Sequence, residues 1–301
     1  MCNKLEKINF TKINLIKQQI DNSNNDNPKL IIESFILPDH RIFNVCQDGY
    51  LIAGTKQRVV VKFIKKIIKN SKQIKYLLYA GMYNGFGAIA TAFAAYRLGL
   101  KSIVFLSKIP NVSIETINNS KQICTLHALN ATIYLCDDFR STRKAEYKLA
   151  SIPDKNNKNK WIDKPEYYVV PMGLKDDNNY MIKHLSKNIK RAAKHTIFNK
   201  IKEKRIWLVA GSSGILQSLY SVYPDASYFV YFTGGGSYKD KSLAWAKEHK
   251  INILNDFKLV KKFDLQRENY YSSIKNYDDL IWNYLLEYGL SGDFIWNVAS
   301  E

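Results

Sequence analysis

A lysine stands at the point where an apolar segment turns into a helix. The stretch Ala53-Gly54-Thr55-Lys56-Gln57-Arg58 follows a strand-like run at 50–52 and opens an amphipathic helix expected over 59–68. Gly54 permits a tight turn and Thr55 is a suitable N-cap, so Lys56 is expected near the positive end of the helix. An ammonium is disfavoured there, and a neutral amine can form a Schiff base with a carbonyl cofactor. The alternative is an ordinary surface lysine in a first helical turn.

A second segment has the features of an anion site. A buried strand is expected at 206–210, followed by Gly211, Ser212, Ser213 and Gly214 and then by a helix. Backbone N–H groups, two hydroxyls and a helix N-terminus together can cradle a phosphate. The segment matches neither a Walker loop nor Gly-x-Gly-x-x-Gly, so a dinucleotide-binding fold has little support. A tight turn with a serine N-cap is the structural alternative.

The surrounding elements alternate between strands and helices, which indicates an α/β fold with parallel sheets. Strands are expected at 30–37, 74–79, 102–106, 132–135, 167–170, 227–232 and 293–298, and helices at 88–98, 112–129, 141–150, 180–201 and 277–288. Residues 151–165 have no periodicity and are the best internal boundary. Ligands of open α/β sheets bind at the carboxyl ends of strands, where the loops at 211–214 and 233–237 are expected.

Composition indicates a folded chain of one large or two modest domains, because 46% of its 301 residues are hydrophobic. No apolar run approaches a membrane span and the N-terminus lacks a signal-peptide core, so we expect a soluble cytoplasmic protein without a membrane partner. The scattered cysteines suggest neither a disulfide framework nor a zinc site, and the five histidines form no metal-type cluster. The cysteines are Cys2, Cys46, Cys124 and Cys136.

The charge is strongly positive, since 45 Lys+Arg against 27 Asp+Glu gives 45 − 27 = +18. Such an excess favours anionic partners, nucleic acid among them. The chain is also rich in Asn, Ile, Lys and Tyr, which have AT-rich codons, so genome composition is an equal alternative. The basic helix at 180–201 is the strongest candidate for an anion-facing patch, with a solvated face as its alternative.

Taken in order, these stretches resemble the fold-type II pyridoxal-phosphate enzymes, the tryptophan synthase β-like group. The nearest likeness is to the aminocyclopropane-carboxylate deaminase and D-cysteine desulfhydrase branch, and it covers the chain from about residue 45 to its end. The motifs are the Gly-x-Lys-x-Arg segment at 54–58, the turn at 81–87 with its Ala-rich helix and Leu98-Gly99-Leu100-Lys101, the turn at 171–173, and the loop at 211–215. No single motif is specific, but their order is.

The resemblance implies a fold of two open, mostly parallel α/β sheets. A small domain at 60–170 would be inserted into a large domain formed by 1–59 and 171–301. It also implies pyridoxal 5'-phosphate as cofactor, Lys56 as the Schiff-base lysine and catalytic base, and no metal. The residues implied to bind the cofactor are Lys56, Asn84, Gly211, Ser212, Ser213, Gly214, Asn297 and Ser300, and those implied to contact substrate are Tyr83, Asn84 and Gly85.

Three positions depart from the family pattern. Phe86 stands where relatives carry the Asn that packs on the cofactor ring, so Asn84 must serve from a shifted turn. Ile215 replaces a common Thr in the phosphate loop. Val298 stands in the column that contacts the pyridine nitrogen, where Asn297 or Ser300 is the polar substitute. Contact from either would leave the pyridine unprotonated, which favours elimination, replacement or deamination over transamination.

The resemblance therefore predicts a lyase- or deaminase-like homodimer that abstracts an α-proton from a small amino acid or an amino-acid-derived group. A variant of this prediction links the amino group to a nucleic acid. The rival hypothesis is a catalytically altered member of the fold that binds nucleic acid or another anion.

Overall fold

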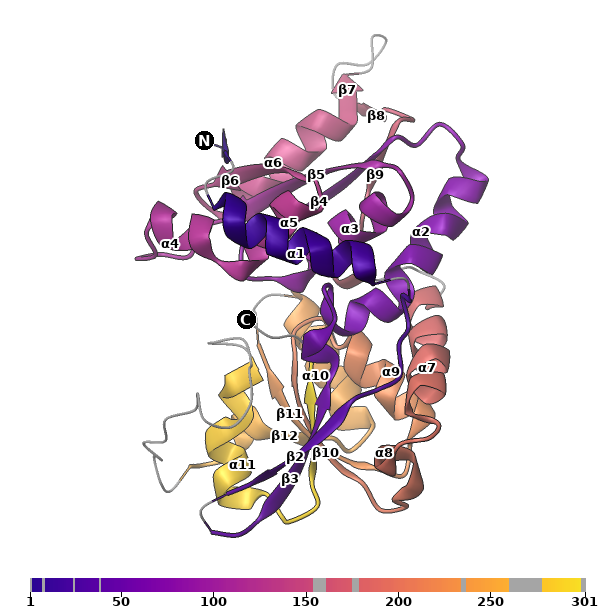
Figure 1. The fold of residues 1–301 in the computed structure, drawn as a ribbon, viewed down its shortest axis with the longest axis vertical. Coiled ribbons are helices and arrows are strands. Elements are labelled where there is room, and N and C mark those ends of the chain that lie inside the picture. Colours follow the sequence, from indigo (N-terminus) through magenta and orange to yellow (C-terminus); the bar gives the residue numbers. More distant parts are fainter. Residues whose placement is uncertain are drawn as a thin grey trace. The chain divides into compact units, whose positions relative to one another are not determined.

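The computed structural model describes residues 2–6, 9–23, 25–37, 39–153, 161–174, 179–233, 237–259 and 278–298. The chain forms two compact units, each with its own sheet (Figure 1). Unit 1 comprises Met1–Asp26 and Val59–Asn178, and unit 2 comprises Asn27–Arg58 and Asn179–Glu301.

Unit 1 contains a five-stranded sheet in the order β1-β6-β5-β4-β9. Its strands are β1 (Cys2–Lys4), β4 (Tyr76–Met82), β5 (Lys101–Ser107), β6 (Thr132–Cys136) and β9 (Tyr167–Val169). Only β1 is antiparallel to its neighbour, while β4, β5, β6 and β9 are parallel. This alternation of parallel strands and crossover helices was expected from the sequence.

Helices connect and cover the strands of unit 1. They are α1 (Phe10–Asn22), α2 (Gln57–Asn70), α3 (Phe86–Arg97), α4 (Ile114–Asn119), α5 (Lys121–Ala128) and α6 (Phe139–Ala150), and a short hairpin of β7 (Ser151–Pro153) and β8 (Trp161–Asp163) follows α6. Helix α3 packs on β4 and β5 and is buried along Gly87–Ala95, because its small side chains permit a close approach to the sheet.

Unit 2 contains a six-stranded sheet in the order β12-β11-β10-β13-β3-β2. Its strands are β2 (Ile32–Ile36), β3 (Ile42–Gln47), β10 (Arg205–Ala210), β11 (Ser227–Phe232), β12 (Asn252–Ile253) and β13 (Phe294–Asn297). All pairings are parallel except that of β2 with β3. One face of the sheet packs around the stacked rings of Trp207 and Phe229.

The helices of unit 2 are α7 (Tyr180–Ala193), α8 (Ile197–Lys200), α9 (Gly214–Val222), α10 (Ser237–Glu248) and α11 (Trp282–Tyr288). Short 3-10 helices add η1 (Asp48–Tyr50), η2 (Gly54–Lys56), η4 (Leu254–Asp256) and η6 (Asp278–Ile281), and η3 (Met172–Leu174) lies in unit 1. Among the described residues, no helix has the length and apolar character that crossing a membrane requires.

Four local predictions were wrong in detail. The run 50–52 is not a strand: β3 ends at Gln47, and two tight turns follow. The helix expected at 112–129 breaks at Ser120, whose hydroxyl caps α5 by accepting from the Ile123 N–H. The helix expected at 180–201 is divided into α7 and α8. The boundary loop at 151–165 contains β7 and β8 at its described ends.

The N-terminal segment Met1–Asp26 belongs to unit 1, whereas the family resemblance implied a large domain that includes residues 1–59. Three contacts explain this placement. Strand β1 pairs with β6, the Leu5 N–H donates to the Ile133 carbonyl over 2.9 Å, and the Lys12 ammonium donates to the Asn119 carbonyl over 2.9 Å. Helix α1 also buries three isoleucines, Ile13, Ile16 and Ile20.

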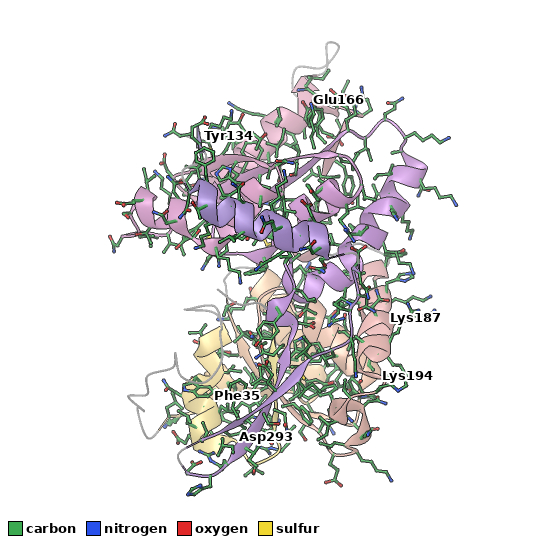
Figure 2. The ribbon with its side chains drawn as sticks, viewed as in Figure 1. Phe35, Tyr134, Glu166, Lys187, Lys194 and Asp293 are labelled. Atoms are coloured by element: carbon green, nitrogen blue, oxygen red, sulfur yellow. A yellow bond between two sulfur atoms is a disulfide. The ribbon has the colours of Figure 1, made fainter. Side chains whose placement is uncertain are left out.

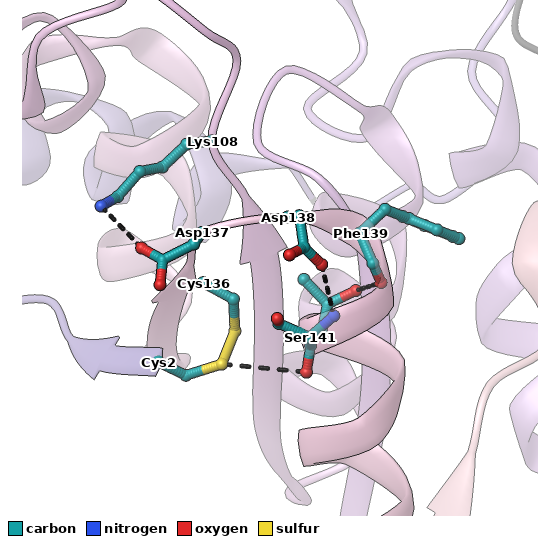
Figure 3. Close-up of a disulfide and its surroundings, with 8 residues drawn as sticks. Cys2, Lys108, Cys136, Asp137, Asp138, Phe139 and Ser141 are labelled. Atoms are coloured by element: carbon teal, nitrogen blue, oxygen red, sulfur yellow. Dashed lines mark hydrogen bonds and ion pairs between the residues drawn. A yellow bond between two sulfur atoms is a disulfide. The ribbon is translucent and has the colours of Figure 1, made fainter.

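A disulfide joins Cys2 and Cys136, which corrects the expectation of no disulfide (Figure 3). The two cysteines are 134 positions apart in sequence and directly opposite each other in the β1–β6 register. Beyond the bond, the Asp138 carboxylate caps α6 by accepting from the Ser141 N–H over 2.7 Å (Figure 3). Cys46 and Cys124 are free and buried.

Candidate active site

Lys56 lies at the end of a turn that is anchored to the last strand of unit 2. It closes η2, directly before α2 begins at Gln57, and it is half-buried. Gly54 has φ +58°, a left-handed conformation that favours glycine. The turn expected at Gly54 is therefore present.

Thr55 joins this turn to β13 instead of capping the helix. Its N–H donates to the Val298 carbonyl over 3.0 Å, and its hydroxyl accepts from the Trp296 indole N–H over 3.1 Å. Thr55 and Trp296 are each 1% exposed. The expectation that Thr55 is the N-cap was wrong, because its backbone lies inside η2 and its hydroxyl is bonded to β13.

Gln57 and Arg58 fix the other side of Lys56. The Gln57 side-chain oxygen accepts from the Ala53 N–H over 3.3 Å, so it bridges back across the turn. The Arg58 guanidinium contacts both carboxylate oxygens of Asp48, and both residues are buried. Lys56 is thus the half-buried residue in a segment whose neighbours are buried and hydrogen-bonded.

The loop between β10 and α9 is the second segment that the sequence predicted for the site. Ser213 has φ +56°, and α9 begins at Gly214. The Ser213 hydroxyl accepts from the Gln217 amide over 3.1 Å and from the Ser242 hydroxyl over 3.0 Å. Because two donors fill its lone pairs, its own proton can serve a further acceptor.

Backbone donors add to this loop. The first N–H groups of a helix have no partner within the helix, and they carry its partial positive charge. Gly211 and Ser212 are half-buried, while Ser213 is 2% exposed. The loop therefore offers hydroxyl and N–H donors of the type that bind a phosphate dianion.

Asn297 ends β13 and is completely buried. Its amide nitrogen donates to the Gln47 side-chain oxygen over 3.0 Å, and the Gln47 amide nitrogen donates to a Glu33 carboxylate oxygen over 2.6 Å. A carboxylate only accepts, so Glu33 fixes which end of the Gln47 amide faces Asn297. The Asn297 amide is oriented through this chain of hydrogen bonds.

Strand order brings these groups to one edge of the sheet. Strands β3, β13 and β10 are adjacent and parallel, so their carboxyl ends lie together. From the pairing of Trp207 with Ile295, Asn297 is level with Val209, two positions before Gly211. The segment carrying Lys56 follows β3 and is bonded to the end of β13. Lys56, Asn297 and the 211–214 loop therefore share the carboxyl edge of unit 2, where ligands of such sheets bind.

Three other predicted site residues belong to unit 1. Tyr83, Asn84 and Gly85 form the turn between β4 and α3, and all three are half-buried. The Tyr83 N–H donates to the Ser107 carbonyl over 3.2 Å and the Gly85 N–H to the Met82 carbonyl over 3.1 Å. Their role toward Lys56 stays a prediction. Ser300 and most of the 233–237 loop lie outside the described residues.

Packing beneath this turn requires a glycine. A Cβ added at Gly87 would lie 2.0 Å from the Tyr79 hydroxyl oxygen, and one added at Gly81 would lie 2.7 Å from the same ring. Burial raises the pKa of Tyr79 to about 12, so this phenol stays protonated at neutral pH. Tyr79 is therefore a packing residue that shapes the turn from below.

Sequence reasoning missed the residues that hold the site together. Among them are Gln47, Asp48, Trp296 and Ser242, each of which contacts a predicted site residue or its neighbour. Asp48 is the nearest of them in sequence, ten positions before Arg58, but its pairing depends on the turns at 48–56 that only the structure shows. The other three had no sequence signal, because their contacts span 29 to 250 positions.

Comparison with solved structures shows which fold this is. The chain aligns with an ACC deaminase homologue at TM-score 0.64 and 14% identity, covering 92% of this chain and 90% of that one. It aligns with a hydrogen sulfide-producing enzyme from Fusobacterium nucleatum at 0.59 and 14%, covering 92% and 98%. It aligns with diaminopropionate ammonia lyase from Escherichia coli at 0.55 and 12%, covering 99% and 90%.

These likenesses confirm the predicted fold class, the fold-type II arrangement of mainly parallel α/β sheets. No protein-family model matches the chain, and no curated protein sequence matches it.

Proposed function

We propose that the chain is a pyridoxal-phosphate-dependent enzyme that removes the α-proton of a small amino acid or an amino-acid-derived group. The observation that carries this proposal is the position of Lys56. It lies at the carboxyl edge of a mainly parallel sheet, in a turn bonded to β13, and the 211–214 loop before α9 lies at the same edge. The fold shared with a deaminase homologue, an ammonia lyase and a sulfide-producing enzyme supports it.

The donor set fits this cofactor. The loop at 211–214 supplies N–H and hydroxyl donors for a phosphate, Lys56 supplies an amine for an aldehyde, and Asn297 supplies an amide. Asp48, the acidic residue nearest along the chain, is neutralised by Arg58 in a buried ion pair of 2.6 Å. The site therefore presents donors and an amine to an anionic aldehyde.

Each group has a separate task in the proposed reaction. Ser212, Ser213 and the first N–H groups of α9 would hold the phosphate, and Asn297, oriented through Gln47, would be the polar residue for the ring. When bound, pyridoxal phosphate supplies a carbonyl that links covalently to an amine and an electron-withdrawing ring that stabilises negative charge at the α-carbon. The Lys56 Nζ would accept the proton from the substrate α-carbon and return it at a later step. Contact of Tyr83, Asn84 and Gly85 with the substrate stays a prediction from the sequence.

The first experiment compares the visible absorption of wild type, Lys56→Ala and Lys65→Ala protein with added pyridoxal phosphate. Lys65 is an exposed lysine of α2, so Lys65→Ala is the matched control. In wild type and the control we expect an absorption band that borohydride removes by reducing the imine, with peptide mass spectrometry placing the reduced adduct on Lys56. An adduct spread over surface lysines, or equal in all three proteins, would contradict the proposal.

A second experiment tests the proton transfer without assuming the substrate. Small amino acids are incubated with the loaded protein in D2O, and exchange at the α-carbon is followed by NMR. Exchange with at least one amino acid in wild type and none in Lys56→Ala is expected. Ammonia, keto-acid or sulfide release then separates deamination from elimination. The homodimer and the cytoplasmic location stay predictions.

A further inference from the structure

Five cationic side chains lie along one face of α7 and its C-cap residue Lys194, and all five are exposed. They are Lys183, Lys187, Lys190, Arg191 and Lys194. Their spacing is i, i+4, i+7, i+8 and i+11, which at 3.6 residues per turn places them within an arc of roughly 100°. We call this set the α7 cationic stripe. Figure 2 shows Lys187 and Lys194 extending outward from the helix.

The opposite face of α7 fixes the direction of the stripe. Met181, Leu185 and Ile189 are buried, and α7 packs against α9. The Ser186 hydroxyl donates to the Ser218 carbonyl over 3.0 Å, which adds a polar contact between the two helices. Because the apolar face is in the protein core, the stripe cannot rotate away from solvent.

Among the described residues, α9, α8 and the segment 27–30 add positive charge beside α7 and no negative charge. Helix α9 carries no charged residue, and α8 contributes Lys200. The segment 27–30 contacts α7 through the Leu30 N–H, which donates to the Ala192 carbonyl, and it contributes the exposed Lys29. Within the described part of the chain, none of the five stripe residues forms an ion pair. The segment 180–202 contains no Asp or Glu.

We propose that the α7 cationic stripe binds the phosphate backbone of a nucleic acid. At 1.5 Å rise per residue the stripe is about 16 Å long. That length matches about five phosphates of one strand at roughly 3.4 Å per step. A small phosphate ligand requires cations that converge, whereas these side chains form a line. An inserting membrane helix requires an exposed apolar face, and the apolar face of α7 is buried.

This site is separate from the Lys56 site and does not depend on the proposed enzyme activity. Five of the cations behind the net charge of +18 lie in the stripe, where they are concentrated on one helix without counter-charges. Binding through phosphates alone carries no base specificity. We therefore expect similar affinity for unrelated sequences of one strand type.

The test uses fluorescence anisotropy of full-length protein with labelled 20-nucleotide RNA and duplex DNA between 50 and 200 mM KCl. Five phosphate contacts predict a slope of log K against log salt of about −3.5 for a single strand and −4.5 for a duplex. The affinity is then expected to fall roughly 100- to 500-fold over this range. A difference between RNA and duplex DNA will show which of the two the stripe prefers.

Two variants that each remove five positive charges distinguish binding by the stripe from binding by the net charge of the protein. The stripe variant is K183Q/K187Q/K190Q/R191Q/K194Q, and the control is K62Q/K65Q/K69Q/K72Q/K75Q, which removes five exposed lysines from α2 and the residues after it. Glutamine keeps helix propensity close to that of lysine, and circular dichroism verifies that both variants fold. We expect the stripe variant to lose most of its affinity and salt slope and the control to keep both.

Three outcomes would overturn the proposal. Equal losses in the two variants would assign binding to net charge. Absence of binding at 50 mM KCl would remove nucleic acid as the partner. Stripe-dependent binding to vesicles containing phosphatidylserine, with none to nucleic acid, would assign the stripe to a membrane surface.

Discussion

The Arg58 guanidinium pairs with both carboxylate oxygens of Asp48, ten positions earlier in the chain, and Lys56 lies within the segment that the pair closes. The Nε distances are 3.0 and 3.1 Å, and one terminal nitrogen lies 2.6 Å from Oδ1. The other terminal nitrogen donates to the Asn27 side-chain oxygen and the Pro28 carbonyl, both over 2.7 Å. Asn188 donates to the Arg58 carbonyl. The pair therefore connects the Lys56 turn to the start of unit 2.

We predict that Asp48→Asn lowers the free energy of unfolding by about 3–5 kcal/mol, because it leaves a buried guanidinium without its counter-charge. The double variant Asp48→Asn with Arg58→Gln should lose less than the sum of the two single changes. Urea unfolding of the four proteins measures this coupling. Additive effects would show that the two groups do not depend on each other.

A negative charge in the 211–214 loop should weaken cofactor binding. Ser212→Asp places a carboxylate beside the proposed phosphate site, where repulsion of about 1–4 kcal/mol between near charges is expected. We predict that the Kd for pyridoxal phosphate rises at least about fivefold. Absorption titration measures it, with Ser212→Asn as the uncharged control. Equal affinity in Ser212→Asp and wild type would place the phosphate elsewhere.

The Cys2–Cys136 bond should stabilise unit 1. It crosslinks positions 134 apart, and a bond closing such a loop contributes about 2–4 kcal/mol in most proteins. We predict that reduction, or Cys2→Ser, lowers the midpoint of unfolding for unit 1. Reductant should have no further effect on Cys2→Ser, which is the internal control. A thiol count of four under non-reducing, denaturing conditions would show that the bond does not form.

Glu146 should make the stability of unit 1 depend on pH. Burial raises the pKa of its carboxyl, and the Arg143 guanidinium, 2.7 Å away, opposes that shift. Because its pKa is higher in the folded state, protonated Glu146 contributes stability below the ordinary pKa of 4.5. This contribution is lost as pH rises through the pKa of the folded state. Glu146→Gln should therefore gain stability relative to wild type as pH rises through that window.

Denaturant unfolding at several pH values measures this difference. Glu115→Gln removes an exposed carboxyl from α4 and is the matched control. If the difference between wild type and Glu146→Gln is flat with pH, or slopes the other way, the proposed effect of burial is wrong.

Local sequence signals located the parts of the candidate site but not their supports. The strand, loop and helix around Gly211–Gly214 could be predicted because each is set by neighbours a few positions away. The end of β13 was also placed within a residue of Asn297. Thr55 was assigned as an N-cap from its residue type, but its hydroxyl bonds to Trp296, 241 positions away.

The sequence by itself determined the α/β alternation, the order of the Lys56 turn and the 211–214 loop, and the cationic face of α7. Each depends on hydrophobic period, turn chemistry or charge within one element. The tertiary structure decided that β13 lies between β3 and β10, that Asn297 is held by Gln47, and that residues 1–26 join unit 1. These outcomes depend on packing and hydrogen bonds between distant segments, which no local pattern encodes.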